Sequence, residues 1–147
     1  MRRKEDPMIR TMLPLALLLA AGPALAQEEG HKLTAALTGA AERPGPGDAD
    51  GAGTAALQVN PGEARVCYTL KVSGIETATA AHIHKARSNE SGPPVATLEA
   101  PADGASEGCA SVTAELAKAL IQTPAGFYVN VHNADFPAGA IRGQLGK

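Results

Sequence analysis

Aromatic side chains are scarce in this sequence: its 147 residues include two Tyr, two Phe and no Trp. Proteins that hold single-stranded nucleic acid need aromatic rings for base stacking and a basic groove for the phosphates. The formal net charge is −2, so the charge balance provides no basic groove. These two absences argue against a nucleic-acid partner.

Large apolar side chains are also in short supply. Hydrophobic residues make up 44% of the chain, but 30 residues are Ala, and 16 Gly and 11 Pro are spread among them. The apolar content is still high enough that global disorder is not expected. The length is too short for two ordinary domains, so the composition predicts one domain with a thin core.

The N-terminal segment has the pattern of a secretory signal peptide. Basic residues precede an apolar run from Met12 to Ala21, and the small-residue site Ala24-Leu25-Ala26 follows it. The run is shorter than the roughly 20 residues that span a bilayer, so a membrane anchor or a buried helix is the less favoured interpretation. We therefore expect residues 1–26 to be a leader, with Met1 or Met8 as the start. The mature chain, residues 27–147, is expected in the periplasm or outside the cell, with no membrane span.

Cysteine occurs at only two positions, Cys67 and Cys109. In an exported protein these two residues meet an oxidising compartment, which favours a disulfide over two free thiols. Closing a loop of this length would stabilise a thin core by about 3–4 kcal/mol in the chain-entropy model. If the disulfide forms, neither sulfur is available as a nucleophile or as a metal thiolate.

Short alternating segments dominate the rest of the chain and predict β-strands. Asn60-Pro61-Gly62 is a turn signal that joins two of them into a hairpin. One helix is expected between Thr113, a suitable N-cap, and Thr123-Pro124, which ends it. The fold class is therefore all-β, an antiparallel Greek-key sandwich or barrel with one short helix. The predicted strands are Leu33–Leu37, Thr54–Val59, Ala64–Val72, Ala78–His84, Val95–Leu98, Gly108–Val112, Phe127–His132 and Ala140–Leu145.

Three histidines lie at positions where strand alternation would expose them together. In a strand, His82 and His84 share one face, with Cα atoms about 6.6 Å apart at about 3.3 Å per residue. Their imidazoles could then reach one metal ion through bonds of about 2.0 Å. On the later strand, Tyr128, Asn130 and His132 share a face, so His132 would complete a set of three if the two strands are neighbours. The alternative is that these residues are surface or hydrogen-bonded strand histidines.

The chain's ligand supply favours copper as the metal, with zinc second. A disulfide leaves no thiolate, and every Met precedes residue 27, which excludes a blue-copper site. Imidazoles suit both copper and zinc, and Cu²⁺ binds the more tightly at the same nitrogen donors. Ca²⁺ and Mg²⁺ prefer oxygen ligands.

His31 is a less favoured fourth ligand. Arg142, Asn130 and Tyr128 could surround the metal, and Arg142 could attract an anion to it, although a surface arginine or an ion pair is the favoured interpretation of Arg142.

Four segments carry recognisable motifs: Ala80-Ala81-His82-Ile83-His84, Gly92-Pro93-Pro94-Val95, Tyr128-Val129-Asn130-Val131-His132 and Gly139-Ala140-Ile141-Arg142-Gly143-Gln144-Leu145. Together these motifs resemble the CHRD domain, named from chordin. The resemblance runs from about Leu33 to Leu145, with Lys85 in place of the family's usual Gly after the second histidine. It implies a secreted single domain whose biochemical role in the family is largely undefined.

A more distant similarity is to the copper–zinc superoxide dismutases, which are Greek-key β proteins with a His-x-His strand, a later His, a disulfide and a C-terminal Arg. This similarity implies copper ligands at His82, His84 and His132. It does not extend to a zinc site, because no His/Asp cluster stands between His84 and His132. Three hypotheses result: a copper-binding domain for storage, buffering or delivery; a non-enzymatic module that contacts a cell-surface or periplasmic protein; and a dismutase-like enzyme with Arg142 guiding superoxide. We rank them in that order.

Overall fold

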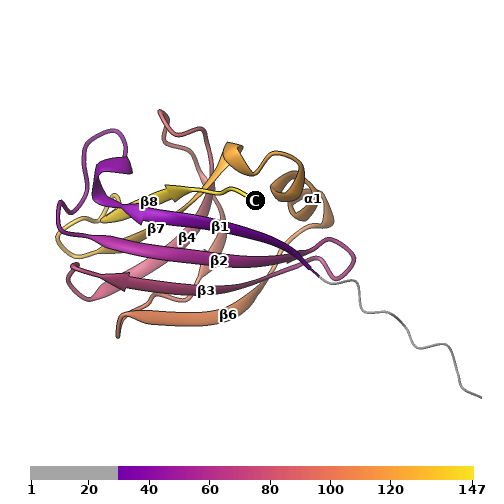
Figure 1. Ribbon diagram of the computed structural model, residues 1–147, viewed down its shortest axis with the longest axis horizontal. Helices are drawn as coiled ribbons and strands as arrows, with labels where there is room; N and C mark the ends of the chain where they lie inside the picture. Colours follow the sequence, from indigo (N-terminus) through magenta and orange to yellow (C-terminus); the bar gives the residue numbers. More distant parts are fainter. Residues whose placement is uncertain (1–29) are drawn as a thin grey trace, which may run out of the picture.

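The computed structural model describes residues 30–147, which form eight β-strands and one α-helix (Figure 1). The predicted leader, residues 1–26, lies outside the described residues. Within those residues, no helix is long and apolar enough to cross a membrane. The elements are β1 (His31–Thr38), β2 (Ala52–Asn60), β3 (Arg65–Ser73), β4 (Ala78–Lys85), β5 (Pro94–Leu98), β6 (Ala105–Ser111), α1 (Ala114–Gln122), β7 (Phe127–Asn133) and β8 (Ile141–Gln144), with 3-10 turns at Gly39–Ala41 and Pro124–Gly126.

All eight strands belong to one antiparallel sheet in the order β5-β4-β7-β8-β1-β2-β3-β6. The sheet curls so that β1, β2, β3 and β6 lie in front of β4 and β7 (Figure 1). Its two edge strands, β5 and β6, contact each other across the remaining seam, where the Ser106 hydroxyl donates to the Glu99 carbonyl at 2.8 Å. In space, β6 lies beside β3, and across the seam β6 is followed by β5 and then β4. This spatial order, which differs from the order in the sequence, is a Greek-key arrangement. The predicted fold class is confirmed.

Strand alternation places the core inside the barrel. In β3 the side chains of Val66, Tyr68 and Leu70 are buried, whereas Lys71 on the opposite face is exposed. β1 and β2 alternate in the same way, with small residues such as Ala35 and Ala55 among the buried ones. Alternating apolar positions are therefore sufficient to orient this half of the sheet.

The strand boundaries differ from the predicted ones where the sequence is polar or rich in glycine. β6 begins at Ala105, three residues before the predicted start at Gly108. Gly108 lies opposite Tyr68, and a Cβ atom there would approach the Tyr68 hydroxyl to 2.9 Å. The glycine is thus needed for packing in the middle of the strand. β1 is also longer than predicted, because it pairs with β2 over its whole length.

The helix α1 begins and ends where the sequence predicts. The Thr113 hydroxyl accepts a hydrogen bond from the Leu116 amide at 3.1 Å, which caps the first turn. Ala117 and Leu120 are the buried residues of the helix. The helix ends at Gln122, one residue before the Thr123-Pro124 pair that cannot continue it.

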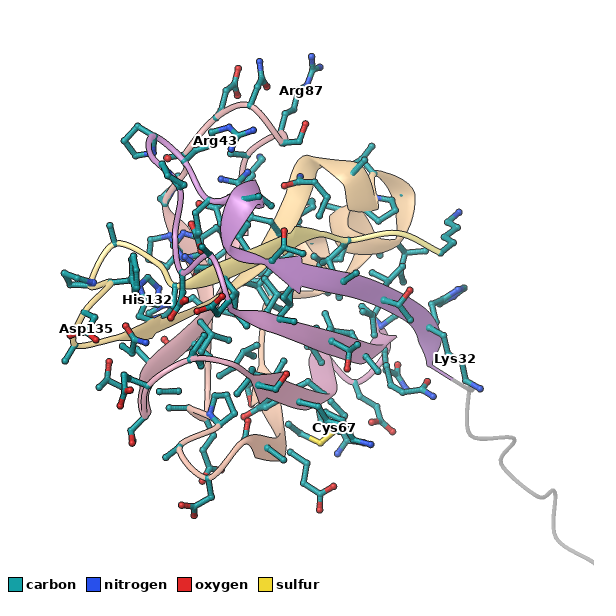
Figure 2. All side chains as sticks on the ribbon, turned by 60° about the vertical axis from the view of Figure 1, so that its left-hand side comes forward. Lys32, Arg43, Cys67, Arg87, His132 and Asp135 are labelled. Carbon is teal, nitrogen blue, oxygen red and sulfur yellow. A yellow bond between two sulfur atoms is a disulfide. The ribbon has the colours of Figure 1, made fainter. Side chains whose placement is uncertain are left out.

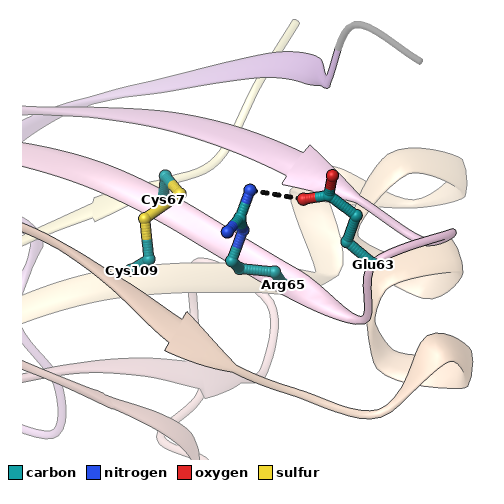
Figure 3. Close-up of a disulfide and its surroundings, with 4 residues drawn as sticks. All are labelled: Glu63, Arg65, Cys67 and Cys109. Atoms are coloured by element: carbon teal, nitrogen blue, oxygen red, sulfur yellow. Dashed lines mark ion pairs between the residues drawn. A yellow bond between two sulfur atoms is a disulfide. The ribbon is translucent and has the colours of Figure 1, made fainter. Parts of the chain in front are cut away.

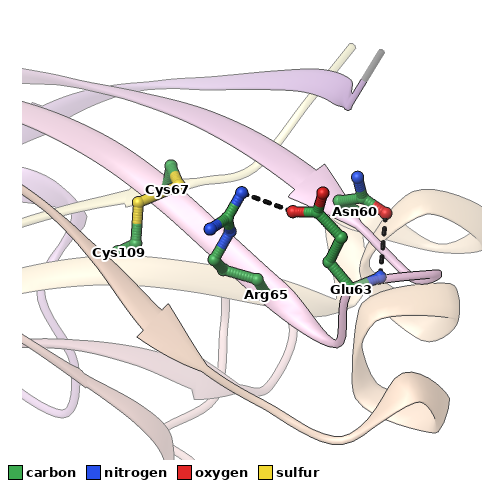
Figure 4. A network of polar contacts seen from close by, with 5 residues as sticks. All are labelled: Asn60, Glu63, Arg65, Cys67 and Cys109. Carbon is green, nitrogen blue, oxygen red and sulfur yellow. Dashed lines mark hydrogen bonds and ion pairs between the residues drawn. A yellow bond between two sulfur atoms is a disulfide. The ribbon is translucent and has the colours of Figure 1, made fainter. Parts of the chain in front are cut away.

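A disulfide joins Cys67 of β3 to Cys109 of β6 on the outside of the sheet, with a Cα separation of 3.9 Å (Figure 3). It ties the edge strand β6 to the sheet across 42 residues of sequence. Two residues from Cys67, Arg65 forms an ion pair with Glu63. The Glu63 amide donates to the Asn60 side-chain oxygen at 3.1 Å, which closes the predicted turn between β2 and β3 (Figure 4).

Candidate metal centre

The two histidine-bearing strands, β4 and β7, are antiparallel neighbours in the sheet. In their register, His82 lies opposite Asn130 and His84 lies opposite Tyr128. His132 is two positions from Asn130, on the same face as His82. Ile83 between the two β4 histidines is fully buried in the core. Topology therefore brings the three predicted histidines together on the outer face of the barrel wall.

The three imidazoles are close enough to share one ion. Each offers one nitrogen, and these nitrogens lie within 4.8 Å of one another. His82 Nδ1 and His132 Nε2 are 3.1 Å apart. Two nitrogens bound to one metal at about 2.0–2.1 Å, at angles between square-planar and tetrahedral values, are about 3.0–3.3 Å apart. That pair therefore already has the separation that a shared metal requires.

Backbone carbonyls fix the orientation of two of the rings. His84 Nδ1 lies 2.8 Å from the Gly92 carbonyl oxygen, and His132 Nδ1 lies 3.0 Å from the Pro137 carbonyl oxygen. A carbonyl oxygen only accepts, so both Nδ1 atoms carry the hydrogen and both Nε2 atoms keep a lone pair. Metal-binding histidines are held in this way by their second nitrogen. His84 Nε2 is buried and has no hydrogen-bond partner.

The third ring, that of His82, is joined to the His132 ring by a hydrogen bond between the two imidazoles. His132 Nε2 keeps a lone pair, so its contact with His82 Nδ1 requires that His82 Nδ1 carry the hydrogen. A metal ion can take the place of that hydrogen if the His82 proton moves to Nε2. The site would then offer Nδ1 of His82 and Nε2 of both His84 and His132.

Burial keeps two of the imidazoles neutral. It lowers the pKa of His82, and the neighbouring His132 and His84 lower it further. Burial also lowers the pKa of His84, although its hydrogen bond to the Gly92 carbonyl partly opposes the shift. Neutral imidazole is the form that binds metal, so the site is prepared for an ion at neutral pH.

Tyr128 and Arg142 support His84 from the neighbouring strands. The Tyr128 ring stacks on the His84 ring with centroids 4.8 Å apart and planes 4° from parallel. The Arg142 guanidinium lies over the same tyrosine ring, 3.4 Å from its centroid. The Tyr128 hydroxyl also accepts from the Gly92 amide at 3.3 Å, so it helps to place the carbonyl that orients His84.

The interpretation of Arg142 as a surface arginine is wrong. Its side chain is 1% exposed, and its guanidinium donates to the carbonyls of Glu90 and Arg87 at 2.8 and 2.7 Å and to the Gln144 side chain at 3.0 Å. These bonds fasten the loop between β4 and β5 over the outer face of β7. Arg142 therefore holds the loop that carries Gly92, and its hydrogen bonds do not point toward an open site.

Three contributors to the site were not predicted from the sequence: Gly92, Pro137 and Glu42. The first two act through backbone carbonyls, which any residue possesses. Glu42 follows the 3-10 turn after β1 and is only 3% exposed. Burial raises its pKa to about 7, although Arg142 and Asn130 partly oppose the shift. A lone Glu in a loop rich in Gly and Pro gives no sign of such burial.

His31 does not join the cluster, which among the described residues consists of His82, His84 and His132. It lies at the start of β1, opposite Val59, and is exposed. Figure 2 shows its neighbour Lys32 at the opposite side of the molecule from His132. The less favoured fourth ligand, His31, is therefore not at the site in this structure.

The comparison with known protein families agrees with the fold and the motifs. The CHRD domain family matches residues 33–145, which include every strand from β2 to β8 and most of β1. No curated protein and no solved structure matched the chain. The match covers well over half of the chain and includes all three clustered histidines. This chain therefore belongs to the CHRD domain family.

Proposed function

We propose that this domain binds one copper ion through His82, His84 and His132, and that it stores, buffers or delivers the metal. One observation carries the proposal: three imidazole nitrogens lie within 4.8 Å of one another. Carbonyl hydrogen bonds leave two of these rings with Nε2 lone pairs, and one of these atoms, His84 Nε2, is buried without a partner. A buried polar atom without a partner is costly, and a metal ion would satisfy it.

The donor set supports copper ahead of zinc. The only cysteines are paired in a disulfide, so the site is made of imidazoles without a thiolate. At nitrogen donors Cu²⁺ binds more tightly than Zn²⁺. We also propose that the protein is exported before it binds the metal, because residues 1–26 have the pattern of a signal peptide and the disulfide suits an oxidising compartment.

The arrangement of Arg142 favours metal binding over a dismutase-like activity. An arginine that guides an anion to a metal needs hydrogens free to meet it. Here the guanidinium is buried, stacked on Tyr128 and engaged with two carbonyls and Gln144. The same contacts hold the loop between β4 and β5 over β7, so the role of Arg142 is to position this loop beside the histidines.

The test is a competitive titration of the purified protein with Cu²⁺ and Zn²⁺, followed by native mass spectrometry and EPR. We expect one Cu²⁺ per chain, bound more tightly than Zn²⁺. The variant His82→Ala/His84→Ala should lose at least about 100-fold in copper affinity, because changes to groups that merely orient ligands already cost 10- to 100-fold. His31→Ala is the matched control and should bind as the wild type does. Unchanged affinity in the double variant would overturn the proposal.

A further inference from the structure

Buried polar atoms without partners are concentrated in one place. Among residues 30–147, three buried side-chain atoms have no hydrogen-bond partner: His84 Nε2, Asn130 Oδ1 and Glu42 Oε1. A metal ion at the histidines would account for the first atom only. The other two are acceptor oxygens, and buried acceptors of this kind need a donor.

The Asn130 side chain connects the metal centre to Glu42. Asn130 lies on the middle strand β7, between His82 of β4 and Arg142 of β8 in the register. Its amide acts on both neighbours, since it raises the pKa of His84 and lowers the pKa of Glu42. Arg142 also acts electrostatically on both His84 and Glu42. The metal centre and the carboxyl group therefore share two neighbours.

Within the described residues, 30–147, no cationic side chain forms a hydrogen bond with the Glu42 carboxyl group. Arg142 gives its hydrogens to the loop carbonyls and Gln144, and Arg43 gives its hydrogens to the backbone carbonyls of Ala40 and Glu42. Asp135 lines the same cavity of about 250 Å³ as Glu42 and Arg43, so the remaining charged group near the cavity is negative. Among the described residues, the one salt bridge is the pair Arg65 and Glu63 on the far side of the sheet.

A proton on the carboxyl group removes the charge from a buried side chain whose Oε1 has no hydrogen-bond partner. Hydrogen bonds with the Asn130 side chain and the Arg43 backbone favour the carboxylate, but burial has the larger effect and favours the neutral acid. Gly139 packs directly against the Glu42 carboxyl group, where a Cβ atom would collide with Glu42 Oε1, so there is no room for a larger residue to supply a donor. The geometry thus favours the neutral carboxylic acid in the metal-free protein.

From this arrangement we infer that Glu42 is a proton store coupled to the metal centre. This inference rests on the proposed function. When a divalent cation binds the three histidines, its charge favours the Glu42 carboxylate, and the O–H bond of Glu42 breaks to release one proton to solvent. Neutral His82 releases none, because its hydrogen moves from Nδ1 to Nε2. Linkage is reciprocal, so a proton that returns to Glu42 weakens the hold on the metal.

This coupling would make the domain a device for delivery. Metal affinity would rise with pH across the range in which Glu42 titrates, and acidification would release the ion. The neutral acid costs less to bury than a carboxylate, so the metal-free fold keeps its proton at moderate pH.

The test is an NMR titration of the Glu42 carboxyl carbon in metal-free and Zn²⁺-loaded protein, with zinc as the diamagnetic probe. In the metal-free protein the carbon should titrate near pH 7, as burial raises its pKa to about 7. Zinc should lower the midpoint by about one pH unit or more, as expected for a divalent charge nearby in a partly buried setting. A midpoint near 4.5 without metal, or one that zinc leaves unchanged, would overturn the inference.

Calorimetry in buffers of different ionisation enthalpy provides the second measurement, with Cu²⁺ as well as Zn²⁺. Below the Glu42 midpoint, the wild type should release close to one proton more per bound ion than Glu42→Gln does. Glu63→Gln is the matched control, since Glu63 is exposed beside the disulfide, and it should behave as the wild type. Equal proton release in Glu42→Gln and wild type would contradict the coupling. Absence of binding would instead contradict the proposed metal site, and the metal-free midpoint would still decide whether Glu42 holds a proton.

Discussion

The barrel wall has two halves that are built differently. In β1, β2 and β3 one face is buried and the other is largely open to solvent, and a disulfide secures the edge. In β7 six of the seven residues are buried, so both faces are covered. The cover on the outer face comes from loops, and Figure 2 shows Arg43 and Arg87 on them, on the far side of the molecule from Cys67. Apolar packing fills the inside of both halves, whereas polar groups fill the outside of the second.

The difference shows where chemistry is placed in this domain. The disulfide half needs only alternating apolar residues and one covalent link. The half that carries the histidines buries an arginine, an asparagine and a glutamate, which are stable there only with partners. All three unpartnered atoms of the described residues lie in that second half. We therefore expect changes in the first half to affect stability alone and changes in the second half to affect metal affinity and its pH dependence.

The largest predicted effect concerns the disulfide half. Cys67→Ser/Cys109→Ser should lower the free energy of unfolding by about 4 kcal/mol, as the chain-entropy model gives for a loop of this length. Copper affinity at temperatures where the variant is folded should equal that of the wild type. Chemical denaturation and copper titration of the same samples measure both quantities. A loss of copper affinity along with stability would show that the two halves are not independent.

The next effect concerns Glu42. Its folded pKa of about 7 lies above the unfolded value of 4.5, so the folded state binds more protons between these values. Stability should therefore fall as pH rises from about 5 to 8, by up to roughly 3 kcal/mol from this group. Glu42→Gln cannot ionise, so its stability should be nearly constant over that range. Urea denaturation at several pH values measures the difference.

A wild type whose stability stays as constant from pH 5 to pH 8 as that of the Glu42→Gln variant would contradict this account of Glu42. Glu63→Gln serves as the control again, because Glu63 is exposed and pairs with Arg65 on the disulfide half. Its pH profile should follow that of the wild type.

The smallest effect compares two tyrosine hydroxyls, one in each half. Tyr128→Phe removes the acceptor for the Gly92 amide, and the loop that orients His84 should loosen. We expect a loss of up to about 10-fold in copper affinity, which is the lower end of the 10- to 100-fold range for mutation of groups that orient metal ligands. Tyr68→Phe removes the acceptor for the Glu99 amide in the other half. It should lower stability by about 1 kcal/mol and leave copper affinity unchanged. The reverse pattern in a paired titration would refute the division.

The sequence predicted the parts of the site that follow from local alternation. His82 and His84 share a face because a strand has a period of two, and the same rule groups Tyr128, Asn130 and His132. That β7 lies beside β4 depends on the Greek-key order, which no local pattern specifies. Once the strands pair, the convergence of the histidines follows from the register.

The remaining contributors depend on tertiary structure alone. Arg142 is a charged residue on a short strand, a position that the sequence predicts to be exposed. It is buried because the loop between β4 and β5 folds over it. Gly92 and Pro137 act through their backbone carbonyls, and because every residue has one, the residue type does not indicate this role. Glu42 lies 88 positions before Asn130 in the chain and reaches it through a loop, at a separation no local pattern spans.

The most direct test of the central claim is X-ray absorption spectroscopy of the copper-loaded protein, with EPR of the same sample. The account predicts three imidazole nitrogens bound to copper at about 2.0 Å. His132→Ala should reduce that number to two, and His31→Ala should leave the spectrum unchanged. A copper site with fewer than three imidazoles, or one that His132→Ala does not alter, would contradict the claim that His82, His84 and His132 hold one metal ion.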